Sequence, residues 1–567
     1  MRKNILNTKR SLVLFAMMLV LACSSSVFAS ATIVINNIDG PGEGFNDPTP
    51  AVPVGGNSGT TKGQQRLIAF TYAANIWGAT LDSNVPIVIQ AAFNPLAPNV
   101  LGSAGTTFIF RDFPGLTALY PGAEFPGTWY GSSLADKRAG VELNPGFPDI
   151  NAQFSSNFNF YLGLDNNHGA LPDLVVVLLH EFAHGLNFQT FVSASSGANF
   201  AGFTDIFARH ILDISNNLHW DQMTQAQRQA SATRFGRVVW DGGSVNGDVP
   251  NVLSFGSPEV RVLTPAAIAA AYQFGTAAFG PPLSSPGVTG SVLNAVDAVE
   301  VGGTSADGCS PFSNAAAVAG KIALVERGLC GFAVKARNAT NAGAIGVMIY
   351  NQAANAGAAP PGMADDGING AFVTIPTVSL TRADGLAILG QVPSGTTARI
   401  SVDLSVRAGA DAAGHARLYA PFPVVGGSSI SHYDTVAFRN LLMEPAINGD
   451  LTHNVQAPDD LTLELLRDVG WFPDADLDGS PDNFDCEPHS DRAPTVVIDG
   501  CNTGVPNPLF TSGCTLSDLI AHRRVAENQQ GQNQGQYELD VDHLLKDLRT
   551  AGIITKAQEK AIKKCLD

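Results

Sequence analysis

One helical motif constrains this chain more than any other feature. His180, Glu181 and His184 form a His-Glu-x-x-His pattern inside an apolar run. Two histidines four residues apart project from one face of a helix, so both imidazoles can reach the same metal ion. Glu181 then lies where it can hold and deprotonate a water molecule on that ion. The pattern predicts two zinc ligands and the general base of a hydrolase, and it requires a third ligand from elsewhere.

The sequence before the motif predicts a buried helix. Residues 173–179 are apolar after Asp173, and Pro172 suits the first turn. A buried helix that carries two imidazoles and a carboxylate needs partners for these polar groups. A bound cation is the simplest partner, which favours a metal site over a chance match to the motif.

Length and charge limit what the chain can do. At 567 residues it is too long for one hydrophobic core, and three or four domains are expected. Its 33 basic residues (lysine and arginine) against 50 acidic residues give a net charge of −17. Such a chain repels phosphate backbones, so no nucleic-acid partner is expected. Its 58 glycines and 34 prolines indicate a chain rich in loops and strands rather than a helical bundle.

The N-terminus has the pattern of an export signal. Basic residues precede an apolar core at residues 12–22 that is too short to span a bilayer comfortably. Small residues before Ser30 predict cleavage after Ala29, and hence a secreted protein with residues 1–29 removed. An alternative reading makes Cys23 a lipid anchor, as in a surface or outer-membrane lipoprotein. No other segment is apolar enough to cross a membrane.

Six cysteines remain after Cys23, an even set that favours disulfides in an oxidising compartment. Pairing that keeps each bridge within one domain would join Cys309 to Cys330, Cys486 to Cys501 and Cys514 to Cys565. Fifteen connectivities are formally open to six cysteines.

Residues 31–260 read as one α/β unit. Periodicity predicts helices at 64–77, 204–214 and 224–235, and strands at 86–93 and 158–163, the last leading into the motif helix.

Over residues 264–404 the sequence pattern changes and predicts short strands and helices rich in glycine and alanine. A strand is expected at 321–328, a helix at 332–342 and a second strand at 346–351. Through "GKIALVERGLCGFAVKARNATNAGAIGVMIYN" and "IPTVSLTRADG" this block resembles the protease-associated (PA) domain. The resemblance implies an accessory or substrate-gating role without catalytic residues of its own.

An aspartate-rich segment follows at residues 474–486. Alternating aspartates around a glycine turn make an oxygen cage suited to calcium. The pattern resembles a thrombospondin type 3-like repeat and differs from an EF-hand, because no glutamate stands at the twelfth position. The candidate calcium ligands are Asp474, Asp476, Asp478, Asp482 and Asp485. Residues 515–567 are expected to form a small helical appendage.

The third zinc ligand has two candidates. In the compact metzincin pattern a glycine and then a third histidine would stand at Asn187 and Thr190. Asparagine tolerates the left-handed exit from a helix, but threonine cannot replace a histidine ligand. One alternative is Asp205 on the next element. The other is His432, which precedes the Met-x-Pro sequence at Met443 by eleven residues.

The second alternative resembles the leishmanolysin group of metzincins, in which the third histidine follows an insertion and precedes a methionine turn. The resemblance implies that His180, His184 and His432 bind zinc, that Glu181 is the base, and that Met443 is the turn methionine. Pro445 stands where a tyrosine ligand would be, so none is expected. The resemblance covers about 40 residues, and the insertion contains the PA-like block.

These observations predict an α/β (α+β) metzincin-like zincin domain that is interrupted by an α/β PA domain. Residues 1–29 are the expected signal peptide. The catalytic domain is expected in two parts, residues 30–263 and 408–473, with the PA domain inserted between them at 264–407. The calcium-binding segment at 474–505 and the helical appendage at 506–567 follow. The expected function is that of a secreted zinc endopeptidase acting on proteins or peptides. The alternative is a non-catalytic surface adhesion or binding protein with a structural zinc site. Glu181 favours the enzyme, since a structural site needs no base.

Overall fold

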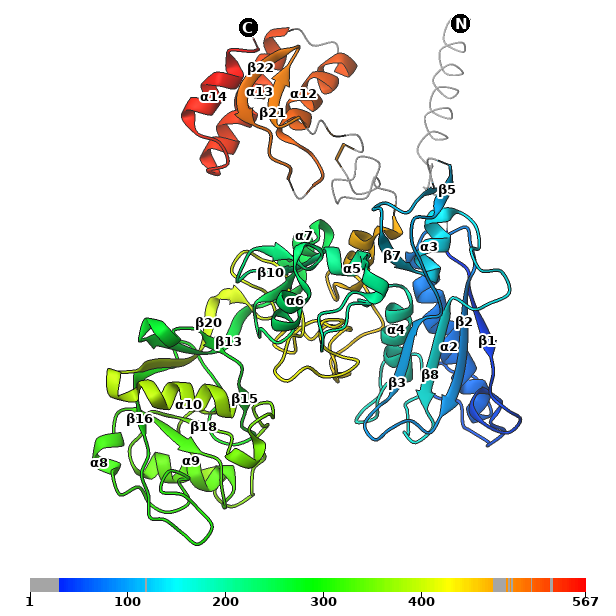
Figure 1. Ribbon diagram of the computed structural model, residues 1–567. Coiled ribbons are helices and arrows are strands. Elements are labelled where there is room, and N and C mark those ends of the chain that lie inside the picture. Colours follow the sequence, from blue (N-terminus) through cyan, green and yellow to red (C-terminus); the bar gives the residue numbers. More distant parts are fainter. Residues whose placement is uncertain are drawn as a thin grey trace, which may run out of the picture.

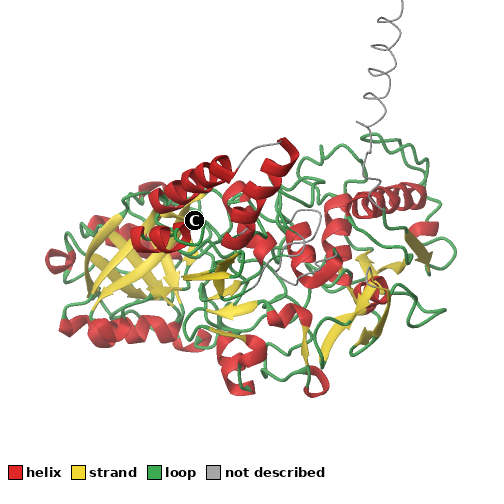
Figure 2. Cartoon of the chain, turned by 90° about the horizontal axis from the view of Figure 1, so that it is seen from above, coloured by secondary structure: helices red, strands yellow, loops and turns green. Residues whose placement is uncertain are grey.

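The computed structural model describes residues 30–117, 120–472, 486–487, 490, 493–510, 512–530 and 534–566. The predicted signal peptide with Cys23 and the aspartates predicted to bind calcium lie outside the described residues. Within the described part, no helix combines the length and the apolar character needed to cross a membrane. Strands gather in several separate sheets with helices around them (Figure 2).

The N-terminal part of the chain forms a four-stranded sheet, and two helices pack against it (Figure 1). The strand order is β1-β2-β8-β3, with three parallel strands and β3 antiparallel at the edge. The elements are β1 (Ile33–Asn37), β2 (Ile87–Asn94), β3 (Gly102–Thr106), β8 (Ile150–Ser155), α2 (Lys62–Thr80) and α4 (Leu174–Gly185). The predicted helix at 64–77 and strand at 86–93 are confirmed.

Helix α4, which carries the motif, is buried over its whole length. Asp173 caps its N-terminus by accepting a hydrogen bond from the Val175 amide. The indole N–H of Trp77 on α2 donates to the Leu179 carbonyl at 3.2 Å, which ties the two helices together. These contacts hold the helix in the core, as its continuous apolar sequence predicts.

Two predicted elements near the motif are wrong. Residues 158–163 form a loop, and the strand before α4 is β8, which ends at Ser155. Residues 204–214 split into β9 (Thr204–Asp205), α5 (Ile206–Arg209) and β10 (Ile211–Asp213). The helix is short because Leu212 instead pairs with Val239 in a sheet of order β11-β10-β12. The helix predicted at 224–235 is confirmed over α6 (Gln225–Ser231).

The remaining elements of this region surround the sheet and the motif helix. They are β4 (Ile109–Phe110), β5 (Pro114–Thr117), β6 (Tyr120–Gly122), β7 (Thr128–Gly131), α3 (Ser132–Ala139), β11 (Leu218–His219), β12 (Val238–Trp240) and α7 (Gly243–Val252).

The inserted domain (residues 255–407) is built on an eight-stranded sheet of order β14-β13-β20-β16-β17-β18-β19-β15. Its strands are β13 (Phe255–Thr264), β14 (Ala271–Tyr272), β15 (Gly275–Thr276), β16 (Val288–Asn294), β17 (Ile322–Glu326), β18 (Gly346–Tyr350), β19 (Thr377–Leu380) and β20 (Thr397–Arg407). Its helices are α8 (Ala315–Val318), α9 (Phe332–Asn341) and α10 (Arg382–Gln391). The three elements predicted between 321 and 351 are confirmed.

Helices α9 and α10 cover opposite faces of this sheet (Figure 1). Ala336 of α9 packs with Val347, whereas Ile388 of α10 packs with Met348, the next residue of β18. Because successive residues of a strand point to opposite faces, the two helices complete a three-layer domain. The long antiparallel pair β13 and β20 joins this domain to the rest of the chain.

After the insertion the chain returns to the core it left. Trp240 donates its backbone N–H to the Ala416 carbonyl, and the indole of Trp471 donates to the Leu186 carbonyl at 2.8 Å. One hydrophobic cluster contains buried residues from both sides of the insertion, including Met443. This part also carries α11 (Thr462–Leu466) and a turn of π-helix at Arg467–Trp471.

The C-terminal domain (residues 493–566) packs a hairpin against three helices. The elements are β21 (Thr495–Ile498), β22 (Cys501–Pro506), α12 (Leu516–Gln530), α13 (Gln534–Thr550) and α14 (Lys556–Lys563). Val496 of the hairpin shares one cluster with Ile562 of α14.

The disulfides follow this packing. Cys309 bonds Cys330, as predicted, but Cys486 bonds Cys514 and Cys501 bonds Cys565, so the other two predicted pairs are wrong. Helix α14 lies against β22 and brings Cys565 to the strand that begins at Cys501. The pairing depends on this long-range contact, which sequence spacing does not report.

Candidate metal centre

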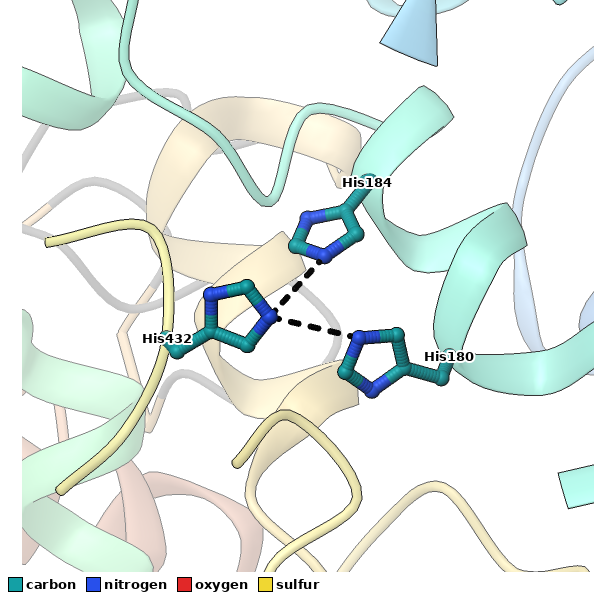
Figure 3. A group of neighbouring side chains, drawn as sticks. All are labelled: His180, His184 and His432. Carbon is teal, nitrogen blue, oxygen red and sulfur yellow. Dashed lines mark hydrogen bonds between the residues drawn. The ribbon is translucent and has the colours of Figure 1, made fainter. Parts of the chain in front are cut away.

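Three histidines from distant parts of the sequence meet at one point (Figure 3). His180 and His184 come from α4, and His432 comes from the loop after the insertion. The Nε2 atom of His432 lies 3.3 Å from Nε2 of His184 and 3.3 Å from Nε2 of His180. A tetrahedral zinc with bonds of about 2.0–2.1 Å holds its nitrogen ligands about 3.3–3.4 Å apart, so the spacing fits that ion.

The other nitrogen of each ring faces a backbone carbonyl. The Nδ1 atoms of His180, His184 and His432 lie 2.7, 2.8 and 2.9 Å from the carbonyl oxygens of Leu442, Phe188 and Ser428. A carbonyl only accepts, so each Nδ1 carries the proton and each Nε2 presents a lone pair. Three lone pairs without a proton between them repel one another, whereas a cation satisfies all three.

Burial keeps these imidazoles neutral. It lowers the pKa of His180 to about 3 and that of His184 to about 4, and it holds the pKa of His432 well below its usual value. Neutral imidazole is the form that coordinates a metal. The electrostatics and the hydrogen bonding therefore agree on the same donor set.

Edge strand β3 positions Glu181. Burial raises the pKa of this carboxyl to about 8, while a hydrogen bond from the Ala104 backbone amide lowers it. A Cβ atom on Gly102 would lie 2.8 Å from Glu181 Oε1 and 2.9 Å from its Cγ. The carboxylate thus rests against a place that only glycine leaves open.

The turn that carries Met443 lies directly against the histidines. Leu442 offers its carbonyl to His180 and its amide to the Asp460 carboxylate, and Met443 accepts a hydrogen bond from the Tyr433 amide. Met443 is fully buried. Glu444 closes the turn by accepting from the Leu441 amide at 2.8 Å rather than orienting a histidine.

The two alternatives for the third ligand are separated by this geometry. Asp205 lies outside the histidine group and is fully occupied as the cap of α5, accepting from the Ala208 and Phe191 amides and the Thr190 hydroxyl. Asn187 has a positive φ of 88°, the left-handed helix exit that an asparagine at this place permits, and its side chain accepts a hydrogen bond from the Gly131 amide. His432 is the residue that the fold brings to the motif.

The histidines line an open cleft of about 800 Å³. Its lining includes β3 with the residues before it and the segments around Ser428 and Ile447. Glu181 is the one carboxylate among the described residues that line the cleft. Gln189 adds a buried amide nitrogen for which the described residues offer no hydrogen-bond acceptor.

Several of these features escape sequence analysis. Strand β3 reads Gly-Ser-Ala-Gly-Thr, which lacks the branched and aromatic residues that mark strands. The carbonyls that orient the histidines have no sequence signature at all. A signal for β3 exists only in the lack of side chains at Gly102 and Gly105, which allows a close approach by other groups.

Each comparison with known proteins covers a minor share of the chain. Residues 288–388 match the family model of the PA domain. The chain is 46% identical over 65 residues to an aminopeptidase of Pseudomonas aeruginosa, covering 12% of each protein. It is 44% identical over 89 residues to the ER degradation-enhancing alpha-mannosidase-like protein 3 of Homo sapiens, covering 15% of this chain and 10% of that protein.

A solved structure gives a similarly partial match. The zinc aminopeptidase BSAP of Bacillus subtilis is 23% identical, with a TM-score of 0.20, over 28% of this chain and 35% of that one. A TM-score this low does not establish a shared overall fold. The chain spans between a tenth and an eighth of the two relatives named above. The match to the family model shows that this mixed α/β chain contains a PA domain at residues 288–388.

Proposed function

We propose that this chain is a zinc-dependent endopeptidase in which His180, His184 and His432 hold the metal and Glu181 is the general base. The convergence of three Nε2 lone pairs beside a buried carboxylate carries the proposal. Three imidazoles with an open position are the donor set of catalytic rather than structural zinc.

When bound there, zinc would supply a Lewis acid that polarises a scissile carbonyl and lowers the pKa of a water molecule, so that the water can be deprotonated for its attack on that carbonyl. The chain's own residues do the rest. Glu181 accepts the proton of the attacking water and returns it to the leaving amine. The Ala104 amide and Gly102 hold this carboxylate in place, and the Leu442, Phe188 and Ser428 carbonyls fix the ring orientations.

The cleft favours cleavage within a chain over removal of terminal residues. Strand β3 is the edge of its sheet, and Gly102, Ser103 and Ala104 line the cleft. An extended peptide adds to such an edge through backbone hydrogen bonds without needing a terminus. An aminopeptidase must bind a desolvated ammonium group, which needs acidic partners. The described cleft lining supplies no carboxylate besides Glu181.

Three further proposals concern the fold, the role of the PA domain and the export of the protein. We propose a metzincin-like arrangement with Met443 in the turn below the metal, supported by the contacts of that turn to His180 and Tyr433. The PA domain is proposed to gate or bind substrate. Export through residues 1–29 remains a proposal that the three disulfides support.

The test compares the wild type with Glu181→Ala for zinc content and cleavage of an internally quenched peptide blocked at both ends. We expect about one zinc in both proteins and cleavage by the wild type alone. A second substrate, an aminoacyl nitroanilide with a free amine, should not be cleaved. A wild type that holds zinc but cleaves neither substrate would point to the non-catalytic binding protein, and cleavage of the nitroanilide alone would refute the endopeptidase.

A further inference from the structure

A second group of potential ligands lies away from the histidines, between α3 and the start of β8. Asp136, Glu142 and Asp149 each offer a carboxylate oxygen, and these three oxygens lie within 4.8 Å of one another. Asp136 and Asp149 are each only 2% exposed, and Glu142 is half-buried. Three carboxylates this close cannot all stay ionised without a cation or shared protons between them.

Backbone amides hold the carboxylates in position. Asp136 Oδ1 accepts from the Leu143 amide at 2.8 Å, Asp149 Oδ2 from the Val88 amide at 2.8 Å, and Glu142 Oε1 from the Asn144 amide at 3.1 Å. The other oxygen of Asp136, Oδ2, is buried and receives no hydrogen bond from an N–H group or a hydroxyl of the described residues; the Asp136 carboxyl instead meets the carboxyls of Asp149 and Glu142, with which it can share a proton when it is not ionised. An ionised oxygen in that position lacks a partner, and a cation among the three carboxylates would be one.

The neighbouring basic side chains do not neutralise the group. Arg138 follows Asp136 by two residues but donates to the Gly122 and Gly470 carbonyls and pairs with Glu124. Burial lowers the pKa of Lys137 to about 8, and the nearby charge of Asp82 offsets part of this effect. Among the described residues, no ion pair is formed by the three clustered carboxylates.

We propose that Asp136, Glu142 and Asp149 bind one divalent cation with a preference for oxygen ligands, namely Ca²⁺. An all-carboxylate set without histidine or cysteine disfavours zinc, and the irregular approach of the three groups suits calcium's flexible coordination better than the strict octahedron of magnesium. Glu142 leaves one side of the cluster accessible, where water completes the coordination.

Such an ion would fasten a surface loop to the framework of the metal centre. The loop from residue 140 to 149 joins α3 to β8 and begins and ends at the cluster. Ser133 of α3 donates to the Gly185 carbonyl at the end of α4, and the Asp149 carbonyl accepts from the Ser132 hydroxyl and the Thr107 amide. A cation here would therefore stabilise the contact between α3, the sheet and the motif helix.

The test uses the full chain with Glu181→Gln, which removes self-cleavage as a cause of calcium-dependent survival. After chelation, Ca²⁺ should raise Tm by about 5 °C, with a smaller effect of Mg²⁺. Glu142→Gln should weaken calcium binding at least tenfold in titration calorimetry. In EDTA the same variant should melt at or above the parent, because the cluster then holds two carboxylates instead of three and their mutual repulsion is smaller. The control variant Asp476→Asn/Asp478→Asn should keep the response and bind one calcium.

Three results would overturn the proposal. An unchanged calcium affinity in Glu142→Gln would exclude the cluster, and loss of all calcium in the control variant would assign the ion to residues 474–485. The absence of any calcium response in the parent would mean that the carboxylates share protons instead. None of these results depends on peptidase activity, so the proposed function is tested separately.

Discussion

The contact between Gly102 and Glu181 allows the base to be moved without changing its chemistry. In Gly102→Ala the new Cβ would lie 2.8 Å from Glu181 Oε1, 2.9 Å from Cγ and 3.0 Å from Cδ. Carbon atoms prefer separations of about 3.5 Å or more, so the carboxylate must shift by roughly 0.5 Å or more. The shift would also strain its hydrogen bond from the Ala104 amide.

A displacement of this size in a catalytic group costs about 10²-fold in rate, or about 2.7 kcal/mol of transition-state stabilisation. We therefore expect kcat/KM of Gly102→Ala on the blocked peptide to fall about 10²-fold. Zinc content and Tm should stay close to those of the wild type, because the histidines and their carbonyl partners are untouched.

The matched control is Gly105→Ala on the same strand. Its Cβ would first meet Gln189 Oε1 at 3.3 Å, the end of a flexible side chain that can give way. It should keep most of the wild-type kcat/KM. If both variants are equally active, then Glu181 is not held by Gly102 and the assignment of β3 as its support is wrong.

Three further outcomes are expected. His432→Ala should lose stoichiometric zinc by elemental analysis while Asp205→Asn keeps it, and retention in the first variant would remove His432 from the ligand set. Asn187→Ala and Asn187→Gly both lose the hydrogen bond from the Gly131 amide, but because φ is 88° there, the alanine variant should lose about 1–2 kcal/mol more of the free energy of unfolding in urea; equal losses would reject backbone strain as the cause of the difference. In EDTA, a histidine of the unfolded state is protonated below about pH 6.5. In the folded state, burial lowers the pKa of His180 to about 3 and that of His184 to about 4, so these two histidines stay neutral down to that pH. Unfolding free energy should then decrease as pH falls from 6.5 to 4, by up to about 1.4 kcal/mol per pH unit for each histidine, and His180→Gln should have a shallower slope; an equal slope would contradict its neutral burial.

The helix and its exit could be predicted because local sequence determines them. The apolar run before His180 is buried as expected, and Asn187 takes the left-handed conformation that an asparagine at this place permits. The histidine on the far side of the insertion could be proposed because it precedes Met443 at a recognisable distance. Its convergence with the motif is a property of the fold, in which 248 positions separate His184 from His432.

Other parts could not be predicted because tertiary contacts decide them. Residues 204–214 read as one helix, but Asp205 is drawn into capping α5 and Leu212 into pairing with β12. Strand β3 has low strand propensity and exists through its pairing with β8. The pairing of Cys501 with Cys565 reflects the docking of α14 on β22, a contact between elements 64 positions apart.

The acidic cluster illustrates the same limit. Asp136, Glu142 and Asp149 have no recognised metal-binding spacing, and the turn of the chain between α3 and β8 is what brings them together. Their sequence separation would suit a solvated loop equally well. Burial of Asp136 and Asp149 distinguishes the two cases.

The position of the zinc is the most direct test of the central claim. Crystals of the full chain grown with zinc should give an anomalous peak at the zinc edge, about 2.0–2.1 Å from Nε2 of His180, His184 and His432. Glu181 should lie beside the peak without coordinating it. A peak that omits His432, or that is coordinated by Asp205, would contradict the three-histidine centre and the catalytic proposal built on it.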